Sequence, residues 1–119
     1  MPKISPRRLV QRSYEAFAAG DRNFFEKHLA ENFTFSSPHD AKLDRAGYFE
    51  RCWPGAGQGQ KFHFLRFIEH DDEVVVTYEM SKANGERGRN TEILRVTDNK
   101  IVSVEVYFGW EIPPGHLNL

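Results

Sequence analysis

The sequence predicts a single α+β domain in which helices come first and a meander of strands follows. Apart from one short strand, helical spacing of apolar residues fills the first 53 residues, and only strand signals follow residue 60. The later strands succeed one another through short turns, as in hairpins, and do not alternate with helices. The length of 119 residues fits one domain over residues 1–119.

The helices are recognised by apolar residues three and four positions apart and by residues that can cap their ends. We predict helices over residues 6–19, 22–29 and 45–53. Ser5, Asp21 and Asp44 can each cap a first turn through a side-chain oxygen. Gly20 can end the first helix because glycine readily takes a positive φ.

The strands are recognised by alternating apolar residues between turn signals. We predict strands over residues 32–36, 61–69, 73–82, 89–97 and 101–110. Asn84-Gly85 is a strong hairpin signal, residues 38–41 are predicted as a loop, and the Gly- and Pro-rich residues 54–59 as a flexible connection. A strongly twisted sheet with helices on its concave side can enclose a pocket.

Charge and composition exclude several classes of protein. The formal net charge is −1 and the pI is about 6.5, which argues against the clustered basic surface of a nucleic-acid-binding protein. No apolar run approaches the roughly 20 residues of a membrane span, and residues 1–8 lead into no apolar stretch of a signal peptide. We therefore expect a cytoplasmic protein that contacts neither nucleic acid nor a membrane.

The histidines and the single cysteine do not indicate a metal centre. The histidines are scattered without paired ligand spacing, at His28, His39, His63, His70 and His116. A lone Cys52 excludes an intrachain disulfide and a cysteine-based zinc site. With no base nearby in the sequence, Cys52 is more typical of a packing residue than of a nucleophile. We expect no metal and no cofactor.

Several segments, in this order along the chain, carry a family resemblance. They are Val10-Gln11-Arg12, Ala18-Ala19-Gly20-Asp21, residues 29–33, Tyr48-Phe49 and residues 100–109. Together they resemble the nuclear transport factor 2-like superfamily, and within it the SnoaL-like polyketide cyclase and ketosteroid isomerase branch. The resemblance implies a cone-shaped, strongly curved antiparallel sheet wrapped around three N-terminal helices. It implies no single reaction, because this fold hosts isomerases, cyclases, hydrolases and binding domains.

The catalytic residues of ketosteroid isomerases can be compared with this chain one at a time. Their aspartate base precedes a proline in the first strand, and Ser37 takes that place here, before Pro38. Their first-helix tyrosine corresponds to Ser13, with Tyr14 about 100° further around the helix. Their aspartate on the penultimate strand corresponds to Glu92. Because two of the three groups are absent, steroid isomerisation is not expected.

A second branch of the superfamily, the limonene epoxide hydrolases, uses an Asp-Arg-Asp arrangement. The strands here hold Glu79, Arg95 and Glu105, but alternation along the strand places Arg95 opposite to Glu92. We therefore expect Glu79, Arg95, Glu105 and Tyr107 to form a network on the outer face of the sheet. In this superfamily that face commonly forms a dimer interface, so the resemblance implies a homodimer.

Three residues are candidates for catalysis. Glu92 is predicted to point into the cone, where burial would raise the pKa of its carboxyl and suit it to act as a general acid or base. The alternative is that Glu92 pairs with a basic residue such as His39 or lies at the cavity rim. His39 and Asp40 follow the first strand, where relatives place catalytic groups, and would assist at the mouth. Their alternative is an ordinary solvated turn.

Aromatic residues are the candidate ligand contacts. Those predicted to line the cavity are Tyr14, Phe17, Phe35, Tyr48, Trp53, Phe64, Tyr78 and Phe108. Tyr and Trp combine an apolar ring with a polar tip, which suits a small apolar ligand with a few oxygens. The alternative is that these rings, together with Phe33, fill a solid core.

These observations lead to a function hypothesis with alternatives. The chain would bind a small apolar oxygenated molecule in the cone and act on it by cofactor-free acid/base chemistry, of isomerase, cyclase or hydrolase type. Alternatively, it would bind such a ligand without turnover, or serve as a dimeric protein-interaction module.

Overall fold

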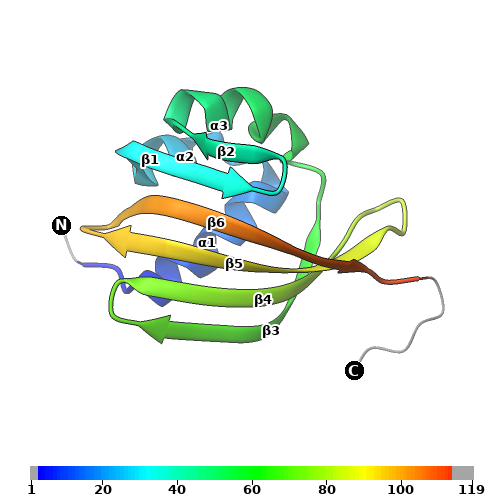
Figure 1. Cartoon of the computed structure of the whole chain (residues 1–119). Helices are drawn as coiled ribbons and strands as arrows, with labels where there is room; N and C mark the ends of the chain where they lie inside the picture. Colours follow the sequence, from blue (N-terminus) through cyan, green and yellow to red (C-terminus); the bar gives the residue numbers. More distant parts are fainter. Residues whose placement is uncertain (1–2, 114–119) are drawn as a thin grey trace.

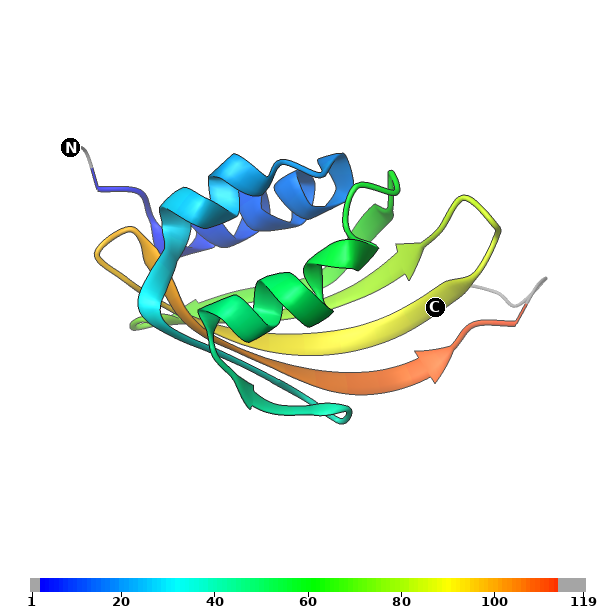
Figure 2. The same ribbon diagram turned by 90° about the horizontal axis from the view of Figure 1, so that it is seen from above.

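The computed structural model describes residues 3–113, and it confirms the predicted α+β fold. The elements are α1 (Pro6–Ala19), α2 (Arg22–His28), β1 (Leu29–Ser37), β2 (Asp40–Leu43), α3 (Arg45–Arg51), the 3₁₀ turn η1 (Trp53–Gly55), β3 (Lys61–His70), β4 (Glu73–Ser81), β5 (Arg87–Thr97) and β6 (Lys100–Glu111). The helices lie on the concave side of one curved six-stranded sheet (Figures 1 and 2).

The caps predicted for the helices are present. The Ser5 side chain accepts a hydrogen bond from the Arg8 amide at the start of α1, and Gly20 ends that helix with φ of 74°. Asp21 and Asp44 cap α2 and α3 in the same way. The last helix ends at residue 51 and not at 53, because residues 53–55 tighten into η1.

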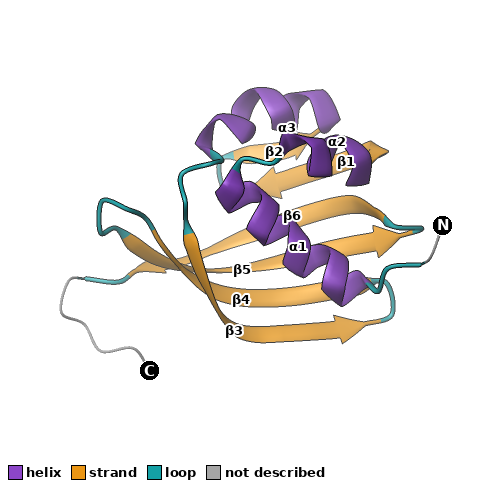
Figure 3. Cartoon of the chain, turned by 180° about the vertical axis from the view of Figure 1, so that it is seen from behind, coloured by secondary structure: helices purple, strands orange, loops and turns teal. Residues whose placement is uncertain are grey.

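The sheet has the strand order β2-β1-β6-β5-β4-β3. Strands β3 to β6 form the predicted antiparallel meander, but β1 runs parallel to β6, so the sheet is mixed. The segment predicted as a loop at residues 38–41 instead turns into the short edge strand β2, which pairs with β1. Figure 3 shows α1 crossing the sheet on its concave face.

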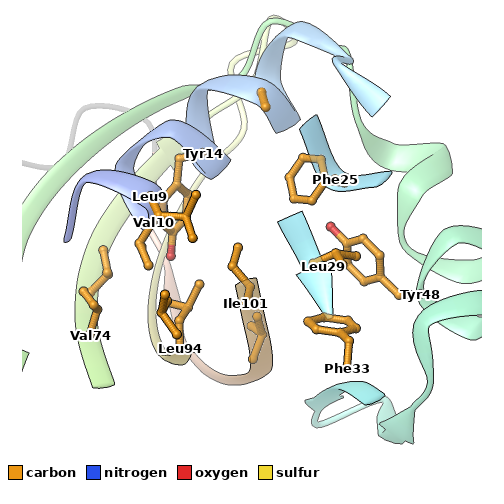
Figure 4. Close-up of a cluster of buried hydrophobic side chains, with 14 of the residues drawn as sticks. Leu9, Val10, Tyr14, Phe25, Leu29, Phe33, Tyr48, Val74, Leu94 and Ile101 are labelled. Carbon is orange, nitrogen blue, oxygen red and sulfur yellow. The ribbon is translucent and has the colours of Figure 1, made fainter. Parts of the chain in front are cut away.

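Part of the core packs the end of the cone where α1 begins. Leu9 and Val10 of α1 are fully buried and belong to one cluster with Val74, Leu94 and Ile101 of the sheet (Figure 4). Burying side chains of this size stabilises the fold by about 1.5–3 kcal/mol each. This end of the cone is therefore closed by packing.

A pair of glycines holds the connection between η1 and β3 against the end of α1. A Cβ added at Gly20 would lie 3.1 Å from the Cα of Gly57, and both glycines have a positive φ. The amide of Gly57 donates to the carbonyl of Phe17 at 2.7 Å, and that of Gly59 donates to the carbonyl of Ala18 at 3.0 Å. The connection is thus fixed by backbone contacts beside Phe17, which lines the cavity described next.

Candidate active site in the cone

The helices and the concave face of the sheet enclose a cavity of about 270 Å³. Its walls are formed by Ser13, Tyr14, Phe17, Phe25, Leu29, Phe33, Phe35, Tyr48, Cys52, Phe62, Tyr78, Met80, Glu92, Leu94, Ile101, Val104 and Val106. The volume lies just below the range of about 300–1,000 Å³ that is usual for ligand sites. The apolar walls and this size suit a small, largely apolar molecule.

Glu92 of β5 is the only carboxyl among the described residues that line the cavity. Neighbouring strands place it there: it pairs with Val76 of β4, and Tyr78 lies two residues further along that strand, on the same face. The Tyr78 hydroxyl donates a hydrogen bond to Glu92 Oε2 at 2.5 Å. No bond to His39 and no ion pair is found for Glu92 within residues 3–113, so the predicted alternative of a basic partner does not apply.

The electrostatics favour the neutral form of this carboxyl. Burial raises the pKa of Glu92, and the hydrogen bond from Tyr78 and the proximity of Tyr14 offset only part of that rise. Burial, followed by the charge of Glu92, raises the pKa of the Tyr14 and Tyr78 hydroxyls. Burial likewise raises the pKa of Tyr48. All three phenols are therefore neutral hydrogen-bond donors near neutral pH.

The first-helix tyrosine of ketosteroid isomerases corresponds in sequence to Ser13, but in this structure it is Tyr14 that lies next to Glu92. Both residues line the cavity, but the Ser13 hydroxyl is used inside α1, where it donates to the carbonyl of Val10 at 2.6 Å. The Tyr14 hydroxyl is buried close enough to Glu92 to lower the pKa of that carboxyl, but it forms no well-aligned hydrogen bond with any described residue. A buried unpaired hydroxyl costs about 1–3 kcal/mol, and a ligand oxygen in the cavity would remove that cost.

Five of the eight predicted ligand contacts line the cavity: Tyr14, Phe17, Phe35, Tyr48 and Tyr78. The other three do not. Trp53 packs behind the wall, with its ring 5.1 Å from that of Phe25. The Phe64 ring packs edge-on against the rings of Tyr14 and Phe67 and is not part of the cavity wall. Phe108 is half exposed, and its ring contacts that of His39 outside the cavity.

His39 lies in the turn between β1 and β2, Asp40 is the first residue of β2, and neither is among the cavity-lining residues. Asp40 is bound to Arg51 of α3 at 2.8 Å and is therefore engaged in an ion pair. Ser37, at the position of the isomerase base, accepts the His39 amide at 3.1 Å. The described part of the cavity thus holds one carboxyl and no second base.

Cys52 follows α3 and lines the cavity, as sequence reasoning did not foresee. Burial and the nearby Asp40 charge raise the pKa of its thiol to about 11. The thiol is therefore protonated and a weak nucleophile at neutral pH. The aliphatic and other aromatic wall residues were also missed, because strand alternation gives the face of a residue but not its depth along the cone.

The predicted outer-face residues do lie on the convex side of the sheet, but they do not form one network. Burial alone would raise the pKa of Glu79, but hydrogen bonds from Arg87 and Arg89 outweigh it and hold that pKa below its usual value. Arg95 pairs instead with Glu73 at the opposite end of the strands.

Two features that would bear on function, a metal-ion cluster and a membrane-spanning helix, are not found among the described residues. Within residues 3–113, no group of three or more His, Cys, Asp or Glu residues is arranged to hold a metal ion; His116 lies outside these residues. In the same part of the chain, no helix has the length and apolar character to span a membrane.

Comparison with known proteins agrees with this geometry. A family model described as the SnoaL-like domain matches residues 10–104. A search of curated proteins found no match. A nuclear transport factor 2-like protein from Cytophaga hutchinsonii is 23% identical, with a TM-score of 0.72 over 91% of this chain and 93% of the other.

Two further solved structures share the fold. A candidate ketosteroid isomerase from Kribbella flavida is 20% identical, with a TM-score of 0.73 over 92% of this chain and 83% of the other. IdmH, a candidate polyketide cyclase from Streptomyces antibioticus, is also 20% identical, with a TM-score of 0.70 over 87% and 91%. At these identities the likeness establishes the fold alone. The family model, which spans most of the chain, establishes more: this protein belongs to the SnoaL-like domain family.

Proposed function

We propose that this chain binds a small apolar molecule with a carbonyl or hydroxyl oxygen in its cone and transfers protons on it through Glu92, without a cofactor. The observation that carries the proposal is a single carboxyl in an apolar cavity, bound to Tyr78 and flanked by the unpartnered Tyr14 hydroxyl. A carboxyl whose pKa is raised by burial is better matched to proton transfer near neutral pH than an exposed one.

The donor set favours rearrangement over hydrolysis. In its ionised form Glu92 would take a proton from the carbon next to a ligand carbonyl, while Tyr14 donates to the carbonyl oxygen. The same carboxyl, which can exchange that proton with solvent in the meantime, would then return a proton to that carbon or to another carbon of the ligand, so one C–H bond breaks, another forms and no co-reactant is consumed. Isomerase- or cyclase-type chemistry needs only this group, whereas hydrolysis also needs a positioned water and a second acid or base.

The test is a thermal-shift screen of small cyclic ketones, enones, lactones and phenols. A ligand at about 100 times its Kd stabilises the protein by about 2.7 kcal/mol, or about 10 °C at this chain length. Val106→Phe narrows the cavity beside Glu92 but keeps the Glu92 carboxyl, so it should abolish the shift, and Glu92→Gln should weaken it. Shifts that survive Val106→Phe would place the ligand elsewhere and contradict the proposal.

Non-catalytic binding in the same cavity is the alternative function. It predicts ligand shifts of equal size in wild type and Glu92→Gln, and no turnover of any ligand. The cavity alone is compatible with both functions, so the Glu92 variant distinguishes them.

We also propose a homodimer through the convex face of the sheet. Ile68, Tyr107 and Trp110 are 53%, 51% and 59% exposed on that face. The ion pairs Arg89–Glu79 and Arg95–Glu73 lie on the same face, and their charges could also meet opposite charges of a second copy across a two-fold axis. Sedimentation should show a dimer for wild type and a monomer for a variant combining Ile68→Lys with Tyr107→Lys. A monomeric wild type would refute this interface.

A further inference from the structure

A bulge between β5 and β6 brings Asn90 beside the site. The pairing of the two strands shifts register between Arg89 and Asn90. At the bulge β6 approaches β5 so closely that a Cβ added at Gly109 would overlap the carbonyl oxygen of Arg89. Only glycine fits there, and this contact sets the position of the Gly109 amide opposite the Asn90 side chain.

Asn90 bridges that backbone amide and Tyr78. Its Oδ1 accepts a hydrogen bond from the Gly109 amide at 3.3 Å, and its Nδ2 donates to the Tyr78 hydroxyl oxygen at 3.4 Å. A backbone N–H can only donate, so the oxygen of the Asn90 amide must face Gly109 and its nitrogen must face Tyr78. The backbone of β6 therefore fixes which end of the Asn90 side chain meets the tyrosine.

This orientation fixes the direction of the next hydrogen bond as well. Because Asn90 donates to the Tyr78 oxygen, the hydroxyl proton of Tyr78 is left to point at Glu92 Oε2, 2.5 Å away. That oxygen of Glu92 is then an acceptor, so in the protonated form of the carboxyl the proton is on Oε1. A chain of donors thus runs from Gly109 through Asn90 and Tyr78 to one oxygen of Glu92.

We propose that Asn90 is a positioning residue for Glu92: it holds Tyr78 as a donor to Oε2, so that Oε1 is the oxygen that exchanges a proton with the ligand. The proposal rests on the proposed function in assigning Glu92 to proton transfer on a ligand. Asn90 itself is not among the residues that line the cavity, and it acts through Tyr78.

The groups that face Glu92 are few, which makes its titration a clean readout. They are Tyr14 from α1, Tyr48 from α3 and Tyr78 from β4, and β6 contributes the apolar Val106. The described cavity walls carry no cation and no second carboxyl. A hydrogen bond from Tyr78 stabilises the ionised carboxyl, and a bond from Asn90 to Tyr78 polarises that hydroxyl and strengthens its donation.

The experiment is a double-mutant cycle read by the pH titration of Glu92 in the ligand-free protein. Protein with ¹³C-labelled glutamate carboxyls is titrated by NMR, and the Glu92 signal is assigned by its loss in Glu92→Gln. The variants are Asn90→Leu, Tyr78→Phe and their combination. Asn90→Ser is a second variant: its hydroxyl stays beside the Gly109 amide but is too short to reach Tyr78.

We expect Asn90→Leu and Asn90→Ser to move the Glu92 midpoint upward, and Tyr78→Phe to move it further, by about one pH unit. In the Tyr78→Phe background Asn90→Leu should not shift the titration midpoint of Glu92 further, because the hydroxyl through which Asn90 acts on Glu92 is absent. If the Asn90 variants lower the melting temperature but leave the midpoint in place, Asn90 only fills the bulge and the proposal is overturned. Equal shifts in both backgrounds would overturn it too.

Failure of this proposal and failure of the proposed function give different results. The titration needs no ligand, so the double-mutant cycle of Asn90 and Tyr78 can still be interpreted if the thermal-shift screen finds no ligand. Conversely, ligand shifts that depend on Glu92 but not on Asn90 would support the function and contradict the positioning role.

Discussion

The carboxyl of Glu92 should make the protein less stable as the pH rises, and Glu92→Gln should remove that dependence. Its folded pKa lies above the ordinary glutamate value of 4.5, mainly because of burial. Below pH 4.5 the proton is held in both states. Between pH 4.5 and the folded pKa the unfolded chain has released it and the folded chain has not, so rising pH favours unfolding.

The size of the effect follows from the linkage relation. The free energy of unfolding of wild type, measured against Glu92→Gln, should fall by about 1.4 kcal/mol for each pH unit in that window. For a chain of 119 residues the entropy of unfolding is about 0.25 kcal/mol/K, so the difference in Tm should change by about 5–6 °C per pH unit. Differences between variants cancel the titration of all other groups.

Calorimetric melts between pH 4 and pH 8 measure this slope. Glu50→Gln is the matched control, because it makes the same chemical change on an exposed side chain of α3. A difference between wild type and Glu92→Gln that is independent of pH, or that slopes in the opposite direction, would refute a raised pKa for Glu92. Either result would mean that Glu92 is ionised in the folded protein at acidic pH.

Three other predictions concern single residues. Gly109→Ala should lower the free energy of unfolding, measured in urea, by about 2–4 kcal/mol. Gly55→Ala should lower it far less, because a Cβ at Gly55 would meet open space. Equal losses would contradict the close approach at the bulge. Cys52 has a pKa of about 11, so at pH 8 it should react with a disulfide reagent about 100-fold more slowly than a thiol of pKa about 8.5. A bound ligand should slow this reaction further. Rapid labelling of Cys52 would be inconsistent with its burial. The Tm of wild type should exceed that of Glu79→Gln above pH 4.5, and this difference should shrink as the pH falls through the lowered pKa of Glu79. The reason is that the Glu79 carboxylate stabilises the folded state only while it is ionised.

The sequence was informative wherever local periodicity decides the outcome. Alternation along the penultimate strand placed Glu92 inward and Arg95 outward, and both are found there. Cap residues located the helix starts for the same reason, since capping depends on a few neighbouring residues. These features need no knowledge of the rest of the chain.

Contacts between distant segments were not predictable in this way. The parallel pairing of β1 with β6 joins residues about 70 positions apart, and no local signal specifies it. The family comparison pointed to Ser13, about 100° from Tyr14 around the helix, but only the observed rotation of α1 shows which of the two faces Glu92. Trp53 illustrates a related limit: an aromatic side chain on the correct face can lie behind the cavity wall.

The most direct test of the central claim is deuterium exchange into a bound ketone. The ketone from the thermal-shift panel that stabilises the protein most is incubated in D₂O with wild type, Glu92→Gln or Val106→Phe, and its deuterium content is measured by mass spectrometry. The account predicts deuterium at the carbon next to the carbonyl with wild type only. Equal incorporation with Glu92→Gln, or none with wild type when the cavity is occupied, would contradict proton transfer by Glu92.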